Sequence, residues 1–435
     1  MPCPRYTFVS DQDWVSFAAH LEERNTPQES VQQSVRCILD EVSSSGDQAL
    51  ASYTQQFDSP DFKPSQIKVP LRALEEALDA VPAQDLALIE ESAANIRRFH
   101  RQQKEHSWLD DSTPGLITGQ LVRPVSRAGL YIPGGRSGDT PLISSLLMNA
   151  IPAQEAEVEG IAIVTPPRKD GTINPYTLAA AAVLGLTEVY AVGSAWAVAA
   201  LGYGTESIPR VEIVTGPGNI FVTTAKRMLA GRVGIDLIAG PSEIAVLADG
   251  TARSEWLAAD LLSQAEHDAQ ASAMLISPDS AVLEKTREAL KKQLHQLPRQ
   301  DVAASALSQW GGLIQVPDLR TGIQLINALA PEHLELCLDD PWSCLSHIRN
   351  AGAIFLGHYT PEPLGDYFAG PNHVLPTMGS ARFASALSVQ NFMKKSSLIA
   401  ATGEYSRRNA DKVARLARLE GLEAHARSAE IRHNQ

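Results

Sequence analysis

The stretch that decides the fold is IAIVTPPRKDGTINPYTLAAAAVLGLTEVYAVG, residues 161–193. It opens with a short β-branched run, IAIVT, which is typical of a buried strand. NPYTLAAAAVLGL follows and predicts a helix, with Asn174 as its N-cap, Pro175 in its first turn and Gly185 near its end. EVYAVG then predicts a second strand. A strand, a helix and a strand in this order form the repeating unit of a parallel sheet.

The same alternation extends along much of the chain. Between about residues 127 and 357, further strands are predicted at VEIVTG, IAVLAD, AMLISP, LIQV and AIFLG. The first hundred residues and the last segment instead space their apolar positions as helices do. We therefore expect an α/β protein whose parallel sheets are covered on both faces, with mainly helical segments at the two chain ends.

The composition excludes several classes of protein. The 435 residues include 37 Lys and Arg against 50 Asp and Glu, a formal net charge of −13, which would repel a nucleic-acid backbone. The N-terminus lacks an apolar signal core, and no apolar run has the length of a membrane span. None of the four cysteines forms a C-x-x-C pair. We expect a cytoplasmic enzyme without nucleic-acid or membrane partners.

Three glycine-rich loops follow predicted strands: LYIPGGRSGD at 130–139, VTGPGNIF at 214–221 and IAGPSE at 238–243. Glycine lets the backbone approach a ligand closely, and a loop that enters a helix favours anionic groups such as nucleotide phosphates. For any one loop alone, a tight turn of an α/β fold is the simpler interpretation. The G-x-G-x-x-G fingerprint of dinucleotide sites does not occur.

Side chains that can bind a metal occur in separate stretches. LLSQAEHDAQ, residues 261–270, places Gln264 and His267 on one face of an expected helix. Asp366 lies seven residues before His373, and His425 lies in the C-terminal helical segment. Imidazole nitrogen and carboxylate oxygen suit Zn²⁺, whereas glutamine is a weak ligand. For each residue alone, an ordinary hydrogen-bonded side chain is the simpler interpretation.

The adjacent residues Glu332 and His333, in PEHLEL, are the best acid–base candidates. Histidine titrates near neutral pH, so it can take a proton from an alcohol and return it, and a neighbouring carboxylate can activate water. Neighbouring side chains of a strand point apart, so the two share a pocket only if the turn at Pro331 is irregular. The alternative is a strand start with one buried histidine.

Together these stretches resemble histidinol dehydrogenase, a family of zinc- and NAD-dependent enzymes that catalyse the last steps of histidine biosynthesis. The resemblance covers nearly the whole chain and rests on motifs in a fixed order. These are AGLYIPGG, LMNAIPA, YGTESIP, GPGNIFVTTAKR, AGPSE, DLLSQAEHD, PEHLEL, GDYFAGPNHVLPT and LEGLEAHARSAEIR.

The resemblance implies a role for each candidate residue. One zinc ion per subunit would be held by Gln264, His267, Asp366 and His425. The catalytic acid–base pair would be Glu332 and His333. L-Histidinol would contact the zinc ligands and His333, together with Ser242 and Glu420, with His373 close by. NAD would contact Tyr131 and Asn219.

The resemblance also implies the architecture: two Rossmann-like α/β domains with small, mainly helical end segments, in a homodimer whose subunits exchange their tails. Residues 1–27 would form an N-terminal segment. The first α/β domain would be discontinuous, over 28–129 and 241–385, and would carry the zinc and catalytic residues. The second, inserted at 130–240, would form the NAD side. Residues 386–435 would be a helical tail that contributes to the partner's site.

The implied reaction is a four-electron oxidation. His333 would remove the hydroxyl proton as hydride leaves to NAD, and Glu332 would activate the water that hydrates the aldehyde before a second hydride transfer. The chain departs from the family on the cofactor side. Trp196 in GSAWA stands where the family usually has a glutamine, and the loop after YIPGG carries Arg136 and Asp139.

Two other interpretations stay open. One is a dehydrogenase of the same fold that oxidises another small alcohol, such as a sulfonated diol; Glu420, the SQAEH motif and the AHARSAEIR tail argue against it, because they suit an imidazole-bearing substrate. The other is a protein of a different class, either a zinc-dependent hydrolase or a non-catalytic dimeric binding protein.

Overall fold

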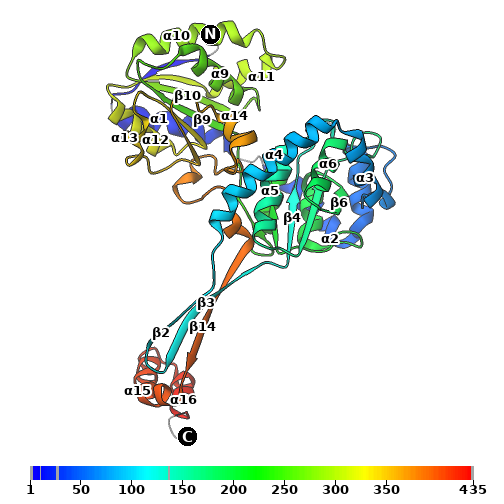
Figure 1. The fold of residues 1–435 in the computed structure, drawn as a ribbon, viewed down its shortest axis with the longest axis vertical. Helices are drawn as coiled ribbons and strands as arrows, with labels where there is room; N and C mark the ends of the chain where they lie inside the picture. Colours follow the sequence, from blue (N-terminus) through cyan, green and yellow to red (C-terminus); the bar gives the residue numbers. More distant parts are fainter. Residues whose placement is uncertain (1–2, 10, 26–28, 136–137, 433–435) are drawn as a thin grey trace.

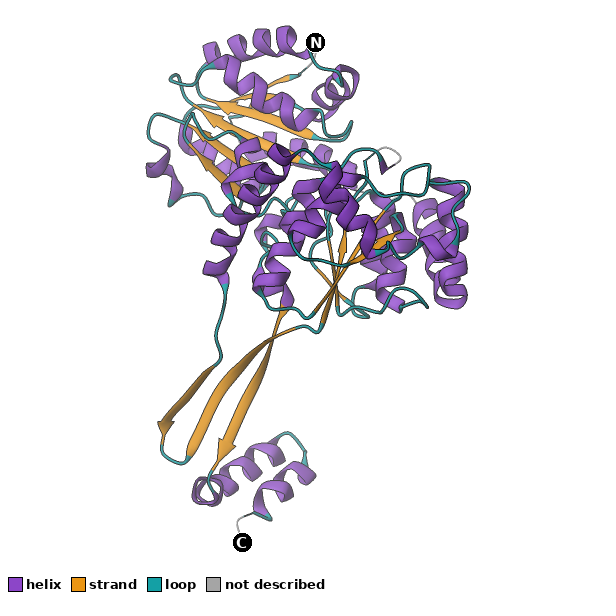
Figure 2. Ribbon diagram, turned by 45° about the vertical axis from the view of Figure 1, so that its right-hand side comes forward, coloured by secondary structure: helices purple, strands orange, loops and turns teal. Residues whose placement is uncertain are grey.

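The computed structural model describes residues 3–9, 11–25, 29–135 and 138–432. Two α/β units, each built on a parallel sheet, lie side by side, and a long arm with a small helical tip extends away from them (Figures 1 and 2). The expected α/β class with parallel sheets is confirmed. Arg136 falls outside the described residues. None of the described helices is long and apolar enough to cross a membrane.

The first unit is built on a six-stranded parallel sheet in the order β1-β11-β10-β9-β12-β13. Its strands are β1 (Arg5–Thr7), β9 (Glu243–Ala248), β10 (Ser272–Ser277), β11 (Gly312–Gln315), β12 (His333–Cys337) and β13 (Ala353–Leu356). Its helices are α1 (Asp11–Glu22), α9 (Ser254–Ala265), α10 (Ser280–Leu294), α11 (Gln300–Trp310), α12 (Leu319–Leu329) and α13 (Pro341–Leu345). The central strands are wholly buried, as their continuous apolar sequences predict.

The second unit has a five-stranded parallel sheet in the order β6-β5-β4-β7-β8. Its strands are β4 (Arg127–Tyr131), β5 (Gly160–Thr165), β6 (Glu188–Ala191), β7 (Ile213–Thr215) and β8 (Gly234–Ile235). Its helices are α5 (Ile143–Glu155), α6 (Pro175–Val183), α7 (Ser194–Tyr203) and α8 (Ile220–Leu229). The predicted cap of α6 is present, because the Asn174 side chain accepts a hydrogen bond from the Tyr176 N–H at 3.0 Å.

The helices α2 (Glu29–Phe57), α3 (Leu71–Ala80) and α4 (Ala83–His100) pack against the five-stranded unit. The family resemblance groups residues 28–129 with the six-stranded sheet, whereas these three helices contact α5, α6 and α7 of the five-stranded unit. The physical reason lies in two contacts that sequence patterns do not reveal. The Val69 N–H donates to the Val189 carbonyl oxygen at 2.9 Å, and the rings of Tyr53 and Phe57 stack on Trp196.

The arm is an antiparallel sheet of β2 (Trp108–Thr113), β3 (Leu116–Pro124) and β14 (Met393–Ala401). It ends in the helices α15 (Gly403–Leu419) and α16 (Glu423–Glu430). The helical tail was predicted, but the arm was not. Every residue of β14 is exposed or only partly buried, so the strand lacks the buried alternation that identifies a strand in sequence.

Candidate active site at the amino edge of the six-stranded sheet

The buried residues Glu332 and His333 meet at the start of β12. The chain enters this strand through Ala330, which ends α12 in the left-handed conformation (φ 52°). Glu332 therefore lies just before the strand, and its Oε2 is 3.6 Å from Nδ1 of His333. The side chains of Glu332 and His333 are 8% and 4% exposed. Because a buried polar group costs free energy unless it is hydrogen-bonded, each needs a specific partner. The two share one site, and the irregular turn allows it.

Glu243, the first residue of β9, binds both members of this pair through its backbone. Its N–H donates to Oε2 of Glu332 at 2.8 Å, and its carbonyl oxygen lies 2.9 Å from Nδ1 of His333. A carbonyl oxygen only accepts, so Nδ1 carries the proton in this contact. In the neutral imidazole the lone pair is then on Nε2, which makes Nε2 the basic nitrogen. Sequence reasoning assigned no role to Glu243.

Asp366 and His373 lie beside this pair. Asp366 belongs to a single π-helical turn, η5 (Gly365–Ala369), which follows the short helix α14 (Glu362–Leu364). Its Oδ1 is 3.7 Å from Nε2 of His333, and its backbone carbonyl oxygen is 3.1 Å from Nδ1 of His373. Such turns are rare and often occur at functional sites.

The π-turn is fixed in place by the second unit. Ser92 of α4 donates its hydroxyl to the Tyr367 carbonyl at 2.7 Å, and the Asn95 amide donates to the Phe368 carbonyl at 3.0 Å. Asp366 is therefore positioned between the two α/β units, although its sequence neighbours belong to the first.

Gln264 and His267 lie at the end of α9. The sequence predicts that the two residues share one helical face. The helix ends at Ala265, however, so His267 lies in the following turn and this prediction is wrong. Gln264 is buried, and its Oε1 has no hydrogen-bond partner among the described residues. His267 is exposed, yet its imidazole is influenced by the charges of Asp366 and His333. Both residues thus lie near the π-turn that carries Asp366.

Glu362 is a further acidic residue that the sequence reasoning missed. One ligand atom each from His333, Glu362 and Asp366 lie within 4.8 Å of one another, a grouping that could hold a metal ion. Glu362 also accepts a hydrogen bond from the Ser263 hydroxyl at 3.0 Å, next to Gln264. The available signal was two carboxylates four residues apart in PEPLGD, which share a face on a helical turn.

The titrating groups of this site influence one another strongly. Burial raises the pKa of Glu332, and burial together with the charge of Asp366 raises the pKa of Glu362 to about 7. Burial alone would lower the pKa of His333, but the carboxylates of Glu332 and Asp366 raise it overall. Burial lowers the pKa of His373, and desolvation by the surrounding protein lowers that of His267 although part of this residue is open to solvent. Both shifts favour neutral imidazoles.

The tail residues Glu420 and His425 lie apart from these side chains. Both are exposed on the helical tip of the arm, far from the two α/β units in both views (Figures 1 and 2). His425 lines an apolar hollow together with Val413, Leu416 and Leu422. The single chain thus brings together Glu332, His333 and Asp366 and places Gln264 and His267 at the nearby end of α9, but it does not bring Glu420 or His425 to them.

A mainly apolar cavity of about 280 Å³ lies next to the π-turn. Asp366 and His373 contribute polar groups to it, and most of the remaining wall is apolar, including Phe99, Phe355 and Leu375. This cavity offers an apolar surface beside Asp366, which in turn adjoins His333.

The residues expected on the cofactor side lie at the carboxyl edge of the five-stranded sheet. Tyr131 ends β4, is buried, and accepts a hydrogen bond from the Ser194 N–H at 3.3 Å. Asn219 caps α8 through its side-chain oxygen. The hydroxyl of Thr223 in α8 donates to the Ala239 carbonyl at 3.2 Å. This contact places the loop before Glu243, which includes the partly buried Ser242, beside the Asn219 loop.

Trp196 is a core residue of the second unit. It is 4% exposed, and its ring stacks on those of Tyr53 and Phe57 with centroid separations of 5.6 and 5.5 Å. The departure from the usual glutamine is therefore accommodated by packing against α2.

Comparison with known proteins identifies the family. A family model described as histidinol dehydrogenase matches residues 21–433. The chain is 58% identical over 432 residues to histidinol dehydrogenase from Oleidesulfovibrio alaskensis, covering 99% of this chain and 100% of that one. It is 56% identical to the protein of that name from Nitratidesulfovibrio vulgaris over the full length of both chains. The crystal structure of histidinol dehydrogenase from Elizabethkingia anophelis matches with a TM-score of 0.92, 35% identity and 98% coverage of each chain. The chain therefore belongs to the histidinol dehydrogenase family of NAD-dependent oxidoreductases.

Proposed function

We propose that this chain oxidises L-histidinol to L-histidine in two NAD-dependent steps, with zinc holding the substrate. One observation carries the proposal: the buried pair Glu332 and His333 adjoins Asp366, while Oε1 of Gln264 and Nε2 of His333 have no hydrogen-bond partner in the described chain. Family membership supports the same reaction and does not favour the alternative of another small alcohol.

We propose Gln264, His267 and Asp366 as the zinc ligands that one subunit supplies. A buried amide oxygen without a donor is unusual, because such groups are normally satisfied, and a cation would satisfy this one. A ligating histidine must be neutral, and the lowered pKa of His267 meets this requirement. Zinc held by these residues would supply a binding site for the imidazole and amine nitrogens of histidinol, which would orient its carbinol carbon.

His333 and Glu332 would then divide the proton transfers. Nε2 of His333 would take the hydroxyl proton, and the Glu332 carboxylate would take a proton from the water that adds to the aldehyde. Bound NAD would supply the hydride acceptor. The carboxylates around His333 raise its pKa. Neutralisation of Asp366 by a bound cation would remove one of these influences and return His333 toward the range of a base. The buried position of the pair would also limit access of bulk water to the aldehyde.

We propose that the functional unit is a homodimer in which each tail completes the partner's site. The tail helices bury only small side chains, namely Ala410, Ala414, Ala417 and Ala426, and leave Leu416, Leu419 and Ile431 about two-thirds exposed. Such a surface is typical of an interaction site. The apolar cavity beside Asp366 would receive the tail of a second copy. His425 would then be the fourth zinc ligand, and Glu420 would contact the substrate.

The two α/β units would bind different ligands. The amino edge of the six-stranded sheet would hold zinc and histidinol, with Ser242 as a further substrate contact. The carboxyl edge of the five-stranded sheet would bind NAD near Tyr131 and Asn219, as open α/β sheets commonly bind ligands at this edge. The four cysteines are all free thiols, which fits a reducing compartment.

The test is to mix the purified protein with L-histidinol and NAD and to follow the absorbance of NADH, with and without a chelator. We expect about two NADH per histidine formed, and loss of activity with chelator that added zinc restores. Oxidation of a sulfonated diol but not of histidinol would reject the proposal. Histidinol oxidation that survives complete removal of metal would reject the role of zinc.

A further inference from the structure

A buried ion pair holds the residue on which both members of the acid–base pair depend. The Glu243 carboxylate pairs with the Arg24 guanidinium, and the two side chains are only 6% and 1% exposed. The same carboxylate accepts a hydrogen bond from the Met378 N–H at 3.1 Å. Arg24, from the short helix η1 (Glu23–Asn25), also donates to the carbonyl oxygens of Leu21 and Gln270. The Glu243 side chain is thus held by two separate segments, those of Arg24 and Met378, and Arg24 is itself anchored on Leu21 and Gln270.

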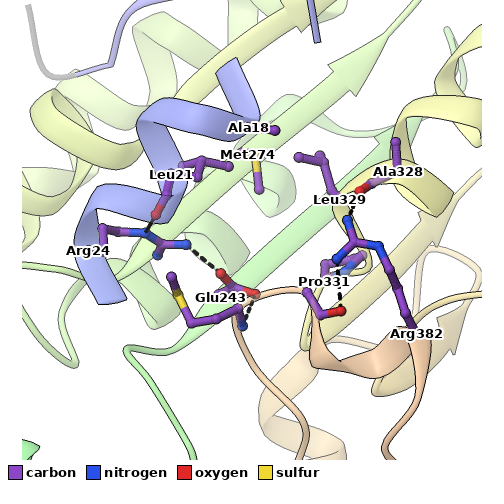
Figure 3. A pocket seen from close by; sticks show the side chains of 11 residues that line it. Ala18, Leu21, Arg24, Glu243, Met274, Ala328, Leu329, Pro331 and Arg382 are labelled. Carbon is purple, nitrogen blue, oxygen red and sulfur yellow. Dashed lines mark hydrogen bonds and ion pairs between the residues drawn. The ribbon is translucent and has the colours of Figure 1, made fainter. Parts of the chain in front are cut away.

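The pocket beside this ion pair is too small to hold a substrate. Figure 3 shows Arg24 reaching from the N-terminal helix to Glu243 across a pocket that Leu21, Met274 and Pro331 also line. The pocket has a volume of only about 40 Å³, which is room for a few water molecules and not for an amino alcohol. The side chains of Arg24 and Glu243 therefore act on the pair through the backbone of Glu243, and the charge of the Glu243 carboxylate adds to the burial that raises the pKa of Glu332.

We propose that Glu243, anchored by Arg24, is a positioning residue for the acid–base pair. Its N–H holds the Glu332 carboxylate, and its carbonyl oxygen keeps the proton of His333 on Nδ1, so that Nε2 presents its lone pair. Loosening the Glu243 side chain shifts both contacts at once, since both backbone groups belong to one residue. This role rests on the proposed function.

The test compares Glu243→Gln and Arg24→Lys with the wild-type, zinc-loaded protein. Glu243→Gln keeps the shape of the side chain but removes its charge, and Arg24→Lys keeps the charge but removes the guanidinium fork. We expect kcat with histidinol to fall about tenfold or more in Glu243→Gln and less in Arg24→Lys, because small misplacements of catalytic groups are costly. The KM for histidinol and the zinc content should stay at wild-type values in both.

The matched control is Glu188→Gln, which breaks an ion pair with Arg127 at the starts of two strands in the other sheet. It should leave kcat unchanged. Wild-type kcat in a folded, zinc-loaded Glu243→Gln protein would overturn the positioning role. So would a fall in kcat that is accompanied by loss of zinc or by a similar rise in KM. If Glu243→Gln does not fold, Arg24→Lys decides by the same kcat and KM criteria. Absence of histidinol oxidation in the wild-type protein would instead reject the proposed function.

Discussion

Nε2 of His333 lies 3.7 Å from Oδ1 of Asp366, so the basic nitrogen of the acid–base pair adjoins a proposed zinc ligand. The other ring nitrogen is engaged with the Glu243 carbonyl oxygen. The Glu243 carbonyl oxygen therefore orients the His333 ring, and Nε2 of the ring faces Asp366. Under the proposed roles, proton transfer and metal binding depend on different residues, so a substitution should remove one without the other.

His333→Asn should lower turnover with histidinol by about two to four orders of magnitude, the usual contribution of a general base. Its zinc content, measured by elemental analysis, should stay normal, because His333 is not among the proposed ligands. The control is His295→Asn, which changes an exposed histidine at the end of α10. A rate near that of the wild-type protein would show that His333 is not the base.

His267→Asn should produce the complementary result. Removal of one imidazole ligand should leave a protein that loses its zinc on dialysis and regains activity only partly in excess zinc. Elemental analysis after dialysis measures the effect directly, and His295→Asn again serves as the control. Retention of a full complement of zinc by the dialysed variant would remove His267 from the ligand set.

Exchange of tails can be tested by mixing two inactive proteins. In a hybrid of His333→Asn and His425→Asn subunits, one site carries both changes and the other carries neither. Random mixing after dissociation should restore about a quarter of wild-type activity, since about half of the dimers are hybrids with one intact site. The control is a mixture of His333→Asn with His267→Asn. It should give no such recovery if the subunits exchange only residues 386–435, because His333 and His267 then belong to the same subunit in every site.

In the second mixture, both changes lie outside the tail, so every site receives a defective core whichever tail completes it. Failure of the first mixture to recover activity, with hybrid dimers demonstrated by a size tag, would contradict the exchange of His425.

Asp58 should make stability depend on pH. Burial raises the pKa of this carboxyl from 3.8 to about 6, and its Oδ2 has no hydrogen-bond partner among the described residues. Because the proton is bound more tightly in the folded chain, Asp58 favours folding below about pH 4, and that contribution is lost as the pH rises through about 6. At neutral pH the charged carboxyl costs up to about 3 kcal/mol, less whatever solvent screening recovers.

Asp58→Asn should therefore raise the unfolding temperature, and the gain should be larger at pH 7.5 than at pH 5. Thermal unfolding followed by circular dichroism at the two pH values measures it. Asp61→Asn changes an exposed neighbour and should show no such gain. A destabilised Asp58→Asn protein at pH 7.5 would mean that the carboxylate has a favourable partner.

Much of the fold could be predicted from sequence because its central strands are continuous apolar runs between helices. The Asn174 cap is a local contact within one turn, so local sequence predicted it correctly. The arm strand β14 was missed because solvent reaches most of it, and its pattern carries no record of a buried face. The packing of α2 on α7 was missed because it depends on side chains more than a hundred residues apart, such as Tyr53 and Trp196.

The site shows the same division between local and distant information. Glu332 and His333 could be chosen from sequence because each is suited to acid–base chemistry and they are adjacent. Glu243 could not, since its backbone, not its side chain, contacts the pair. Arg24 lies 219 positions away from Glu243, and only the folded chain shows that the two form an ion pair.

Trp196 gives the last prediction, because it occupies the position of a glutamine that the family resemblance places on the cofactor side. Its ring is 4% exposed and packs on Tyr53 and Phe57, so its main role should be to stabilise the fold. Trp196→Gln should lower the free energy of unfolding by about 3 kcal/mol or more, as large-to-small core changes do, without lowering the KM for NAD. Trp196→Phe is the matched control: Nε1 has no hydrogen-bond partner in the described chain, so loss of the indole N–H sacrifices no contact and stacking persists. A Trp196→Phe protein of normal stability with a strongly raised KM for NAD would show instead that the indole contacts the cofactor.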